Sequence, residues 1–244
     1  MKVLALDSSG LVASVALVTE EQVIGEYTIN YKKTHSQTLL PMLDVMFKQL
    51  DMEIAEIDAI AVSGGPGSFT GLRIGAATAK GLGLALDKPL IHIPTAEGMA
   101  YQMYGVDGLI CPIMDARRAQ VYTGIYAFDT AGEPSGEADR SFHVIEAQMA
   151  IAMEDLIEKL NYMGQPVTFL GDGVPVHRTL LEEKLVVPYF FAPSYCNRQS
   201  AAAVGALGIE YYQAGKIESA AEHQPDYLRV SQAERERAEK EMSK

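Results

Sequence analysis

The stretch AIAVSGGPGSFTGLRIGAATAKGLGLAL, residues 59–86, decides the fold class of this chain of 244 residues. Its apolar beginning, residues 59–63, predicts a buried strand, and the glycines after it predict a tight turn. The remainder, residues 71–86, contains good helix formers and no proline, and therefore predicts a helix. Strand, glycine turn and helix in this order place backbone N–H groups at a helix N-terminus, the usual setting for binding an anion or a substrate. The segment thus predicts an α/β fold.

The glycine turn lacks the residues that three familiar loops require. A Walker A loop has a lysine after its last glycine, but Gly71 is followed by Leu72. A dinucleotide-binding fingerprint needs a third glycine where this chain has Thr70. A nucleophile elbow is approached only around Ser63, with Ala61 in place of the first glycine. The favoured interpretation is that the glycines let the strand and the helix pack closely.

The run GPGSFTGLRIG at 65–75, followed by AKG at 79–81, strongly resembles the TsaB (YeaZ) family. Similar matches to family patterns are LALDSSG at 4–10, HSQTLLP at 35–41, DARRAQVY at 115–122 and PDYLR at 225–229. The resemblance implies an actin-like, Hsp70-like (ASKHA) fold of two RNase H-like βββαβα lobes. It also implies a part in forming N6-threonylcarbamoyladenosine at position 37 of tRNA, as a non-catalytic dimerisation or scaffold subunit that supports the catalytic TsaD protein.

The resemblance implies further partners. These are a TsaE-like ATPase in the complex, a second copy of the chain when it is alone, and tRNA only indirectly. No firmly bound cofactor is expected, and ATP or ADP would bind at the level of the complex. The two cysteines, Cys111 and Cys196, lie far apart and predict a reduced cytoplasmic protein without a disulfide framework. No apolar run reaches the roughly 18 residues that span a membrane, so no membrane association is expected.

The composition limits the chemistry of the surface. Apolar residues make up 48% of the chain, which is ample for a core, and the formal net charge is −12. Because nucleic-acid binding rests largely on lysines and arginines that neutralise phosphates, so acidic a chain is a poor candidate for the main tRNA-binding surface. Arg73, Arg117 and Arg118 could form a local positive patch, although solvated or ion-paired arginines are the favoured interpretation.

The comparison with the TsaD family predicts no metal site. TsaD proteins continue after the same turn and helix into Asn-His-x-Glu-Gly-His, whose histidines bind a metal, and this chain reads PTAEGM at 94–99 in that register. Glu97 persists, but Thr95 and Met99 stand at the histidine positions, and a hydroxyl and a thioether cannot replace two imidazoles there. His92 lies nearby without a histidine four residues on. Stoichiometric metal that is lost on mutating His92 or Glu97 would contradict this prediction.

The two halves of the chain repeat a pattern of strands and turns. An apolar strand ends at Asp7 and another at Asp115, each before a short turn and a further strand. Two later strands run into Gly64 and Gly171. The separation between these two glycines is almost the same as that between Asp7 and Asp115. The pattern predicts a duplicated βββαβα unit, with lobes at 1–104 and 105–230 and a charged tail at 231–244.

Hydrophobic periodicity and turn residues predict the individual elements. Strands are expected at 2–6, 13–19, 23–29, 59–63, 90–93, 109–114, 120–128, 141–145 and 167–171. Helices are expected at 35–50, 71–86, 95–104, 147–160, 176–185 and 200–214. The charges of 232–244 predict a frayed end or a solvated helix.

The ends of the two first strands predict a degenerate nucleotide cleft. In ATP-using relatives of this fold, aspartates at these ends face each other and act on phosphates through Mg²⁺ and water. The corresponding residues here, with the small polar loop and the glycine turn beside them, are Asp7, Ser8, Ser9, Asp115, Gly171 and Asp172. An alternative of at least equal weight is that the two aspartates are structural leftovers of the fold. Robust ATP hydrolysis by the isolated chain would count against the leading interpretation.

Two helices predict a partner surface. Gly71, Gly75, Ala79 and Gly83 form a stripe of small residues, although each glycine costs roughly 1 kcal/mol of helix stability, which favours the close approach of another backbone. Because the family pairs through these helices, the predicted interface consists of Leu39, Leu43, Met46, Leu72, Arg73, Gly75, Thr78, Ala79 and Leu82. A charge at Gly75 or Ala79 is expected to abolish pairing and leave the fold intact. Alternatively, both faces are covered within the lobe.

Two other functions remain open from the sequence. One is an M22-glycoprotease-like hydrolase that uses Ser63 or Ser68 with one of five histidines, although no histidine lies in a recognisable triad motif. The other is a degenerate ASKHA ATPase of the sugar- or acetate-kinase kind. It is disfavoured by Ala116, which stands where a glycine is expected, and by the lack of an evident catalytic base.

Overall fold

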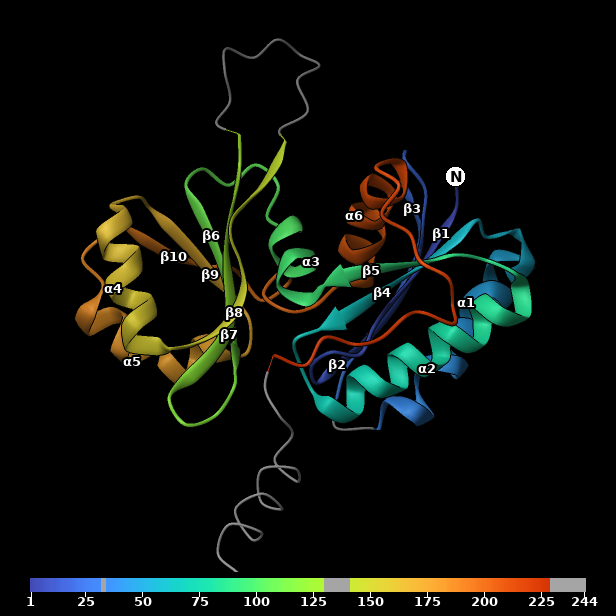
Figure 1. Ribbon diagram of the computed structural model, residues 1–244, viewed down its shortest axis with the longest axis horizontal. Helices are drawn as coiled ribbons and strands as arrows, with labels where there is room; N and C mark the ends of the chain where they lie inside the picture. The colour runs from blue at the N-terminus through green and yellow to red at the C-terminus, as the bar shows by residue number, and fades with distance from the viewer. Residues whose placement is uncertain (32–33, 130–140, 229–244) are drawn as a thin grey trace, which may run out of the picture.

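The computed structural model describes residues 1–31, 34–129 and 141–228, and the predicted tail lies outside these ranges. Two five-stranded sheets lie side by side with helices on their faces (Figure 1). The first has the order β3-β2-β1-β4-β5 and the second β8-β7-β6-β9-β10. In each sheet the first three strands in sequence are antiparallel and the other two add in parallel. The identical topology confirms the predicted fold class, a duplicated RNase H-like unit in the actin-like arrangement.

The elements follow the same order in both halves. The first half contains β1 (Val3–Asp7), β2 (Val12–Val18), β3 (Val23–Asn30), η1 (His35–Gln37), α1 (Leu39–Leu50), η2 (Ile54–Glu56), β4 (Ala59–Gly65), α2 (Phe69–Leu86), β5 (Leu90–Pro94) and α3 (Thr95–Tyr101). The second contains β6 (Leu109–Asp115), β7 (Gln120–Phe128), β8 (Phe142–Ala152), α4 (Met153–Met163), β9 (Val167–Leu170), α5 (Gly173–Lys184), β10 (Tyr189–Phe191) and α6 (Ala201–Gln213).

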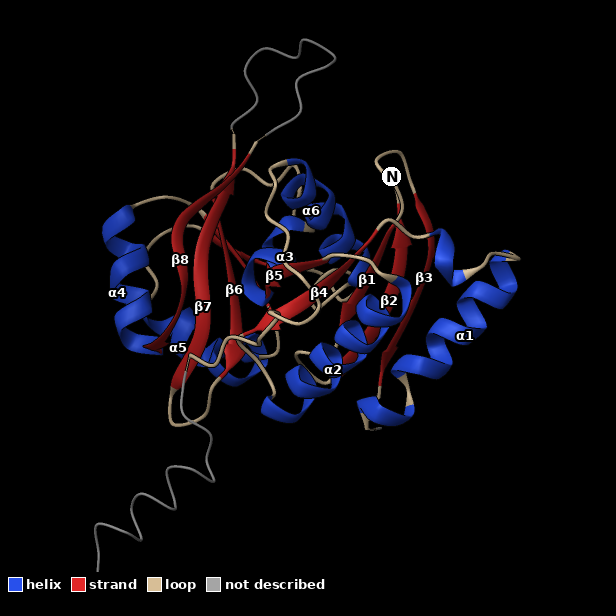
Figure 2. Cartoon of the chain, turned by 45° about the vertical axis from the view of Figure 1, so that its right-hand side comes forward, coloured by secondary structure: helices blue, strands red, loops and turns tan. Residues whose placement is uncertain are grey.

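Apolar helix faces cover both sides of each sheet. On the outer sides, α1 and α2 pack on the first sheet, and α4 and α5 pack on the second. On the inner sides, α6 packs on the first sheet and α3 on the second, so these two helices lie between the sheets (Figures 1 and 2). The strands β1, β2 and β4 are buried along their whole length, as strands covered on both faces must be.

The two inner helices cross between the predicted lobes. The helix α3 lies within the predicted first lobe, 1–104, but packs on β6 and β7 of the second sheet. The helix α6 lies within 105–230 but packs on the first sheet, where Ser14 Oγ accepts a hydrogen bond of 2.9 Å from the N–H of Ala201. The lobes are therefore not two continuous stretches of chain. The position of these helices is determined by the packing of their apolar faces, which does not depend on distance along the sequence.

We expect Ser14→Ala to lower the free energy of unfolding by about 1–3 kcal/mol, because it leaves a buried N–H at the start of α6 without an acceptor. Ser14 is fully buried in β2, and its hydroxyl also contacts Thr28 and Glu26 of β3. Urea unfolding measures the change, with the exposed Ser36→Ala as the control that should stay within about 0.5 kcal/mol of the wild type. Equal stability of the two variants would contradict this account of the helix.

The structure corrects the predicted helix at 147–160. Residues 142–152 form the long strand β8, which pairs with β7 from Phe128↔Phe142 to Gln120↔Ala152. The residues at its end favour helices intrinsically, but pairing along the neighbouring strand overrides this weak preference, and α4 begins only at Met153. The three-residue strand β10 was not predicted, because so short a segment has no measurable periodicity.

Candidate functional site

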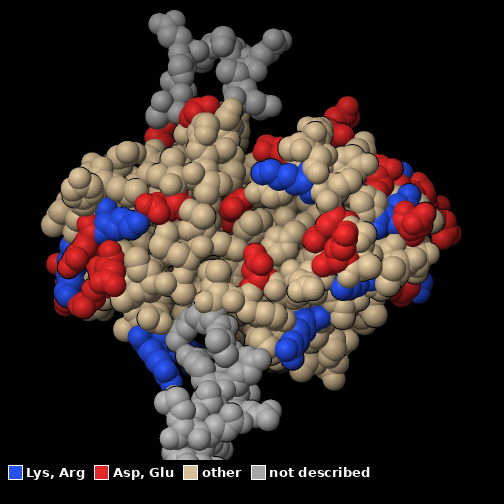
Figure 3. Space-filling model, in the orientation of Figure 1, with Lys and Arg blue, Asp and Glu red and all other residues tan. Residues whose placement is uncertain are grey.

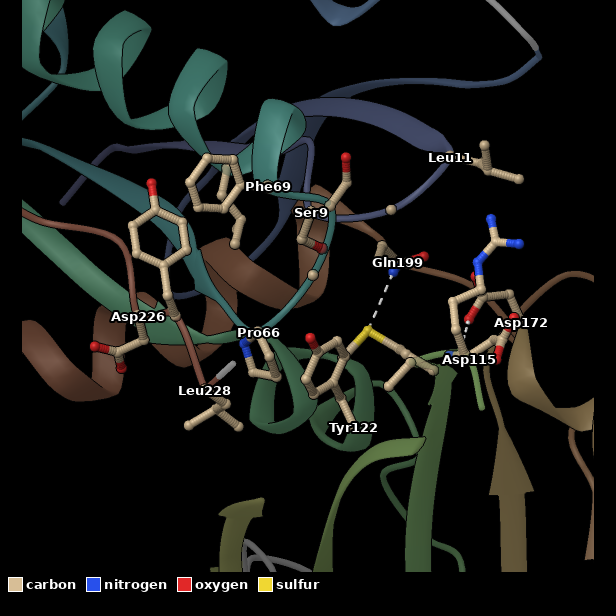
Figure 4. Close-up of a pocket in the computed structure, with 18 of the residues that line it drawn as sticks. Ser9, Leu11, Pro66, Phe69, Asp115, Tyr122, Asp172, Gln199, Asp226 and Leu228 are labelled. Carbon is tan, nitrogen blue, oxygen red and sulfur yellow. Dashed lines mark hydrogen bonds between the residues drawn. The ribbon is translucent and has the colours of Figure 1, made fainter. Parts of the chain in front are cut away.

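A cavity of about 440 Å³ lies between the two sheets, a size typical of small-molecule sites. The segments that line it are the loop after β1, η1, the glycine turn at the start of α2, the turn that joins β6 to β7, the residue after the glycine turn of β9, and the chain just before and well after α6. Figure 4 shows their side chains facing one another across the cavity. Residues on its wall include Ser9, His35, Phe69, Asp115, Arg117, Tyr122, Asp172, Gln199, Asp226 and Leu228.

Asp7 lies behind the wall of the cavity rather than on it. Its carboxylate is buried and accepts hydrogen bonds from the N–H and hydroxyl of Ser9, at 2.9 and 2.8 Å, and from the Ser63 hydroxyl at 2.5 Å. Ser8 is buried as well, and its hydroxyl donates to the carbonyl oxygen of Gly71. Of this predicted loop, only Ser9 lines the cavity. The arrangement supports a structural role for Asp7, the alternative that the sequence left open.

The glycine turn packs against the backbone of the loop after β1. A Cβ at Gly67 would lie 2.2 Å from the carbonyl oxygen of Ser9, and one at Gly71 would lie 2.0 Å from that of Ser8. The N–H of Ser68 donates to the Ser9 carbonyl at 2.6 Å, and Ser68 caps α2 by accepting from the N–H of Gly71. The glycines therefore serve close backbone packing, as the sequence favoured.

Two carboxylates of the second sheet reach the cavity. Asp172 accepts a hydrogen bond of 3.2 Å from the N–H of Asp115, and Asp115 accepts one of 2.9 Å from the N–H of Arg117. Burial raises the pKa of Asp172, and so does the nearby charge of Asp115, while the Asp115 N–H and Arg198 lower it. Gly171, whose φ is +108°, lies beneath them against the carbonyl of Ile113. The structure thus brings Ser9, Asp115 and Asp172 together, three of the six predicted cleft residues.

The turn between β6 and β7 is strained at the edge of the cavity. Arg117, Arg118 and Ala119 have φ values of 64°, 56° and 56°, a left-handed conformation that is unfavourable for residues other than glycine. Such strain concentrates at functional sites. Of the described residues that line the cavity, Arg117 is the only lysine or arginine, against Asp115, Asp172 and Asp226. A nucleotide's phosphates would therefore need a cation or a partner's basic residues to be held here.

The chain after α6 forms the wall that periodicity could not predict. It runs back over the first sheet, pairs with Leu90 through Glu218, and reaches the cavity at residues 226–228 (Figure 1). The rings of Tyr227 and Phe69 pack at a tilt of 38° with centroids 4.6 Å apart, and Arg73 lies over the Phe69 ring and donates to the Tyr227 hydroxyl. The PDYLR match at 225–229 was the sequence signal for this segment, although Arg229 lies outside the described residues.

Gln199 is a second lining residue that the sequence did not predict. It is buried where the two sheets meet, beside Gly10, and its amide donates weakly to Met114 Sδ at 3.7 Å (Figure 4). His35 is buried next to it in space, with Nε2 at 2.9 Å from the carbonyl oxygen of Gly10. Gln199 belongs to no motif, and His35 opens the HSQTLLP match at 35–41, but only the folded chain brings the two residues to the cavity.

The predicted partner interface needs correction. Leu39, Leu43, Met46, Leu72, Gly75 and Ala79 are all buried in the chain's own core. Only Arg73 is exposed, and Thr78 and Leu82 are half-buried. The apolar stripes of both helices thus face the first sheet, as the alternative had it, and a charge at Gly75 or Ala79 would disrupt the fold itself. A stripe in the sequence identifies an apolar face but not what covers it.

The serine nucleophiles of the hydrolase hypothesis have no histidine partner in the described part of the chain. Ser63 is buried and donates to Asp7, and Ser68 Oγ serves as the cap of α2. Neither contact resembles the serine–histidine pair that activates such a nucleophile.

The positions of the TsaD metal motif are buried in this chain. They are occupied by Thr95, Glu97 and Met99, and Glu97 accepts a hydrogen bond from the Tyr211 hydroxyl.

Comparison with known proteins agrees with this geometry. A family model described as TsaD, tRNA N6-adenosine threonylcarbamoyltransferase, matches residues 22–237. The tRNA threonylcarbamoyladenosine biosynthesis protein TsaB of Bacillus subtilis is 33% identical over 96% of both chains. TsaB of Haemophilus influenzae is 30% identical over 94% of both chains. The solved structure of YeaZ from Pseudomonas aeruginosa superposes with a TM-score of 0.74 at 24% identity, covering 93% of this chain and 100% of that one.

The paired sheets and the cavity between them define a two-lobed α/β protein of the actin-like class. Relatives that match over nearly their whole length place it more narrowly. The chain belongs to the TsaB family, which takes part in the biosynthesis of threonylcarbamoyladenosine in tRNA. The described residues contain no helix that is both long and apolar enough to cross a membrane.

We expect Asp7→Asn to stabilise the fold at neutral pH. Burial raises the pKa of Asp7, although hydrogen bonds from Ser63 and Ser9 lower it. A carboxyl whose pKa is higher in the folded state stabilises fully only below its unfolded pKa of about 3.9, and this contribution is lost as the pH rises through the folded value. Asn removes the charge, and its amide can still form hydrogen bonds with Ser9 and Ser63.

Urea unfolding between about pH 4 and pH 8 measures this effect. The stability gained by Asp7→Asn should grow with pH from the acid end. Asp44→Asn, the same substitution at an exposed carboxylate, is the matched control. A variant that loses stability at neutral pH would show that the hydrogen bonds of the charged form outweigh its burial.

Proposed function

We propose that this chain is a non-catalytic subunit that binds a TsaD-type enzyme and supports it in forming N6-threonylcarbamoyladenosine at position 37 of tRNA. Membership of the TsaB family supports the pathway. The packing of Ser63 and Ser68, which occupies both candidate nucleophiles in structural hydrogen bonds, supports a subunit without its own hydrolytic chemistry. The single observation that carries the partner proposal is an exposed apolar surface on α1 and α2.

This partner surface, as we call it, consists of Leu40, Val45, Ala77, Gly81, Leu82 and Leu84. Leu40 is 55% exposed and Leu84 67% exposed, and Ala77 and Gly81 lie on the solvent side of α2. A groove of about 660 Å³ runs between Leu40 on α1 and Leu82 on α2. Exposed apolar surface bordered by polar residues is typical of protein–protein contacts. Figure 1 shows the two helices side by side on the outside of the first sheet.

The remaining partners follow from the same proposal. Among its described lining residues the cavity has Asp115, Asp172 and Asp226 against one arginine, which supports ATP or ADP binding only in the assembled complex, where a TsaE-like ATPase could contribute. On the face drawn in Figure 3, acidic and basic side chains are interspersed and the described residues form no continuous basic area. This supports indirect contact with tRNA. We further propose that the chain alone forms a homodimer through the partner surface. Its proposed location is the cytoplasm.

Mixing this chain with the TsaD protein of the same organism tests the proposal. Size exclusion with light scattering should give a heteromer, and threonylcarbamoyladenosine should form on tRNA when the remaining pathway proteins and ATP are present. The chain alone should form none, and leaving it out should lower the initial rate at least about tenfold, equivalent to about 1.4 kcal/mol of activation free energy. Neither a complex nor an effect on the rate would overturn the proposal and favour a self-associating protein with another function.

A further inference from the structure

Two histidines and two carboxylates meet beside the first sheet, next to the cavity, and one of the carboxylates, Asp226, also lines it. His92 lies on β5, and Glu218, His223 and Asp226 belong to the segment 217–228 that follows α6. One nitrogen of each histidine and a carboxylate oxygen of Glu218 lie within 4.8 Å of one another. The two imidazole rings are 5.6 Å apart between centroids. The fold thus gives His92 the histidine partner that its sequence neighbours lack.

Within the part of the chain that the structure describes, both Nε2 atoms in this cluster are buried without a hydrogen-bond partner. His223 is only 1% exposed, and its Nδ1 is 2.6 Å from Glu218 Oε1, which leaves Nε2 as the unpaired nitrogen. His92 Nε2 lies 3.3 Å from Asp226 Oδ2 but does not meet hydrogen-bond geometry. An unsatisfied buried polar atom in a native structure needs an explanation, and a bound ion is one. Two of them in one cluster point to a ligand.

The donor set fits a transition metal of the zinc class. Imidazole nitrogens and carboxylate oxygens are the common ligands of such ions, and catalytic or structural sites use three or four of them. Two ligands of one tetrahedral zinc, each about 2.0 Å from the metal, lie about 3.3 Å apart, which is the distance between His92 Nε2 and Asp226 Oδ2. A carboxylate bonded to the other ring nitrogen, as Glu218 is to His223, typically orients a metal-binding histidine.

The backbone around the cluster leaves room for the histidine and holds the segment in place. The ring of His92 lies directly over Gly64, where a Cβ would come within 2.1 Å of it, and the carbonyl oxygen of Gly64 accepts from the N–H of Asp226. Lys80 donates to the carbonyl oxygens of Ala221 and His223. The positive charge of Lys80 disfavours a cation nearby, but the negative charges of Glu218 and Asp226 in the cluster favour one.

We propose that His92 Nε2, His223 Nε2 and Asp226 bind one divalent transition-metal ion of the zinc class, and that Glu218 orients His223 through its other ring nitrogen. This revises the expectation of no metal site, which rested on Thr95 and Met99 at the histidine positions of the TsaD motif and on the sequence neighbours of His92. The ion joins the segment 217–228 to the first sheet, and residues 226–228 of that segment form a wall of the cavity. Metal binding therefore orders one side of the cavity. The inference stands independently of the function proposed above.

Titration of the full chain with Zn²⁺ tests the site. The protein is first stripped with a chelator, and affinity and stoichiometry are measured against a chromophoric zinc indicator. We expect one equivalent to bind to the wild type and to His143→Gln, a control in which an exposed histidine beside Asp129 is changed. His92→Gln and His223→Gln should weaken binding by about 100-fold or more. Cobalt bound in place of zinc should show the visible absorption of a tetrahedral site only in the wild type and the control.

Because His223 is buried, its substitution can fail for structural reasons. Circular dichroism checks the fold of each variant, and Glu218→Gln and Asp226→Asn, at more exposed positions, serve as replacements that should also weaken binding. Hydrogen exchange supplies the second readout, since zinc should slow exchange in 217–228 of the wild type and not of His92→Gln. Absence of one-to-one binding in the wild type, or affinity retained in folded His92→Gln, would overturn the proposal.

Discussion

We expect Gly71→Ala to lower the free energy of unfolding by about 3 kcal/mol or more, while Gly81→Ala in the same helix raises it by about 0.5–1 kcal/mol. The added methyl at position 71 would lie 2.0 Å from the carbonyl oxygen of Ser8, so one of the two backbones must move. At position 81 no atom of the described residues lies within 4 Å of the added atom, and only the helix preference of alanine remains. The two changes have the same chemistry and opposite expected signs.

Urea unfolding followed by circular dichroism measures both variants against the wild type. A domain is typically stable by about 5–15 kcal/mol, so the loss at position 71 is a large share of the total. If Gly71→Ala leaves little folded protein, the fraction folded without urea already gives the sign. Equal and small effects at both positions would show that the loop after β1 can move away from α2 at little cost, contrary to its close packing.

Local pattern and repetition were sufficient to predict the architecture. The aspartates that end β1 and β6, and the glycine turns after β4 and β9, stand at matching places because both sheets have the same topology. Hydrophobic runs identify strands whose burial on both faces leaves a continuous apolar signal. The exceptions depend on contacts between distant segments, as with β8, whose helix-favouring residues are held extended by β7.

The candidate site was only partly predictable for the same physical reason. Asp115 and Asp172 follow strands of one sheet, so their meeting could be inferred from topology. Gln199 and the segment 226–228 reach the cavity only because α6 crosses back to the first sheet. His92 was judged by its sequence neighbours, and its actual neighbour, His223, follows much later in the chain. Hydrophobic periodicity identifies the apolar faces of helices and strands, and packing between distant segments determines which of these faces come into contact.

The partner surface gives the second large expected effect. We expect Ala77→Arg to weaken the complex with the TsaD-type protein by about 100-fold or more, which corresponds to about 2.8 kcal/mol. Ala77 is exposed near the middle of α2, so a long charged side chain there leaves the core untouched but must be desolvated when a partner covers the helix. Light scattering detects loss of the heteromer, and isothermal titration gives the change in affinity.

Val176→Arg is the matched control, because Val176 is 59% exposed on α5 of the other sheet, away from the partner surface. It should leave the affinity within about threefold of the wild type, less than 1 kcal/mol. The buried positions of the original prediction make a further distinction. A charge at Ala79 should destabilise the isolated chain, whereas one at Ala77 should not, since only Ala77 faces solvent. Full affinity in a folded Ala77→Arg variant would place the partner elsewhere on the chain, and equal losses in both arginine variants would point to long-range charge rather than contact on α2.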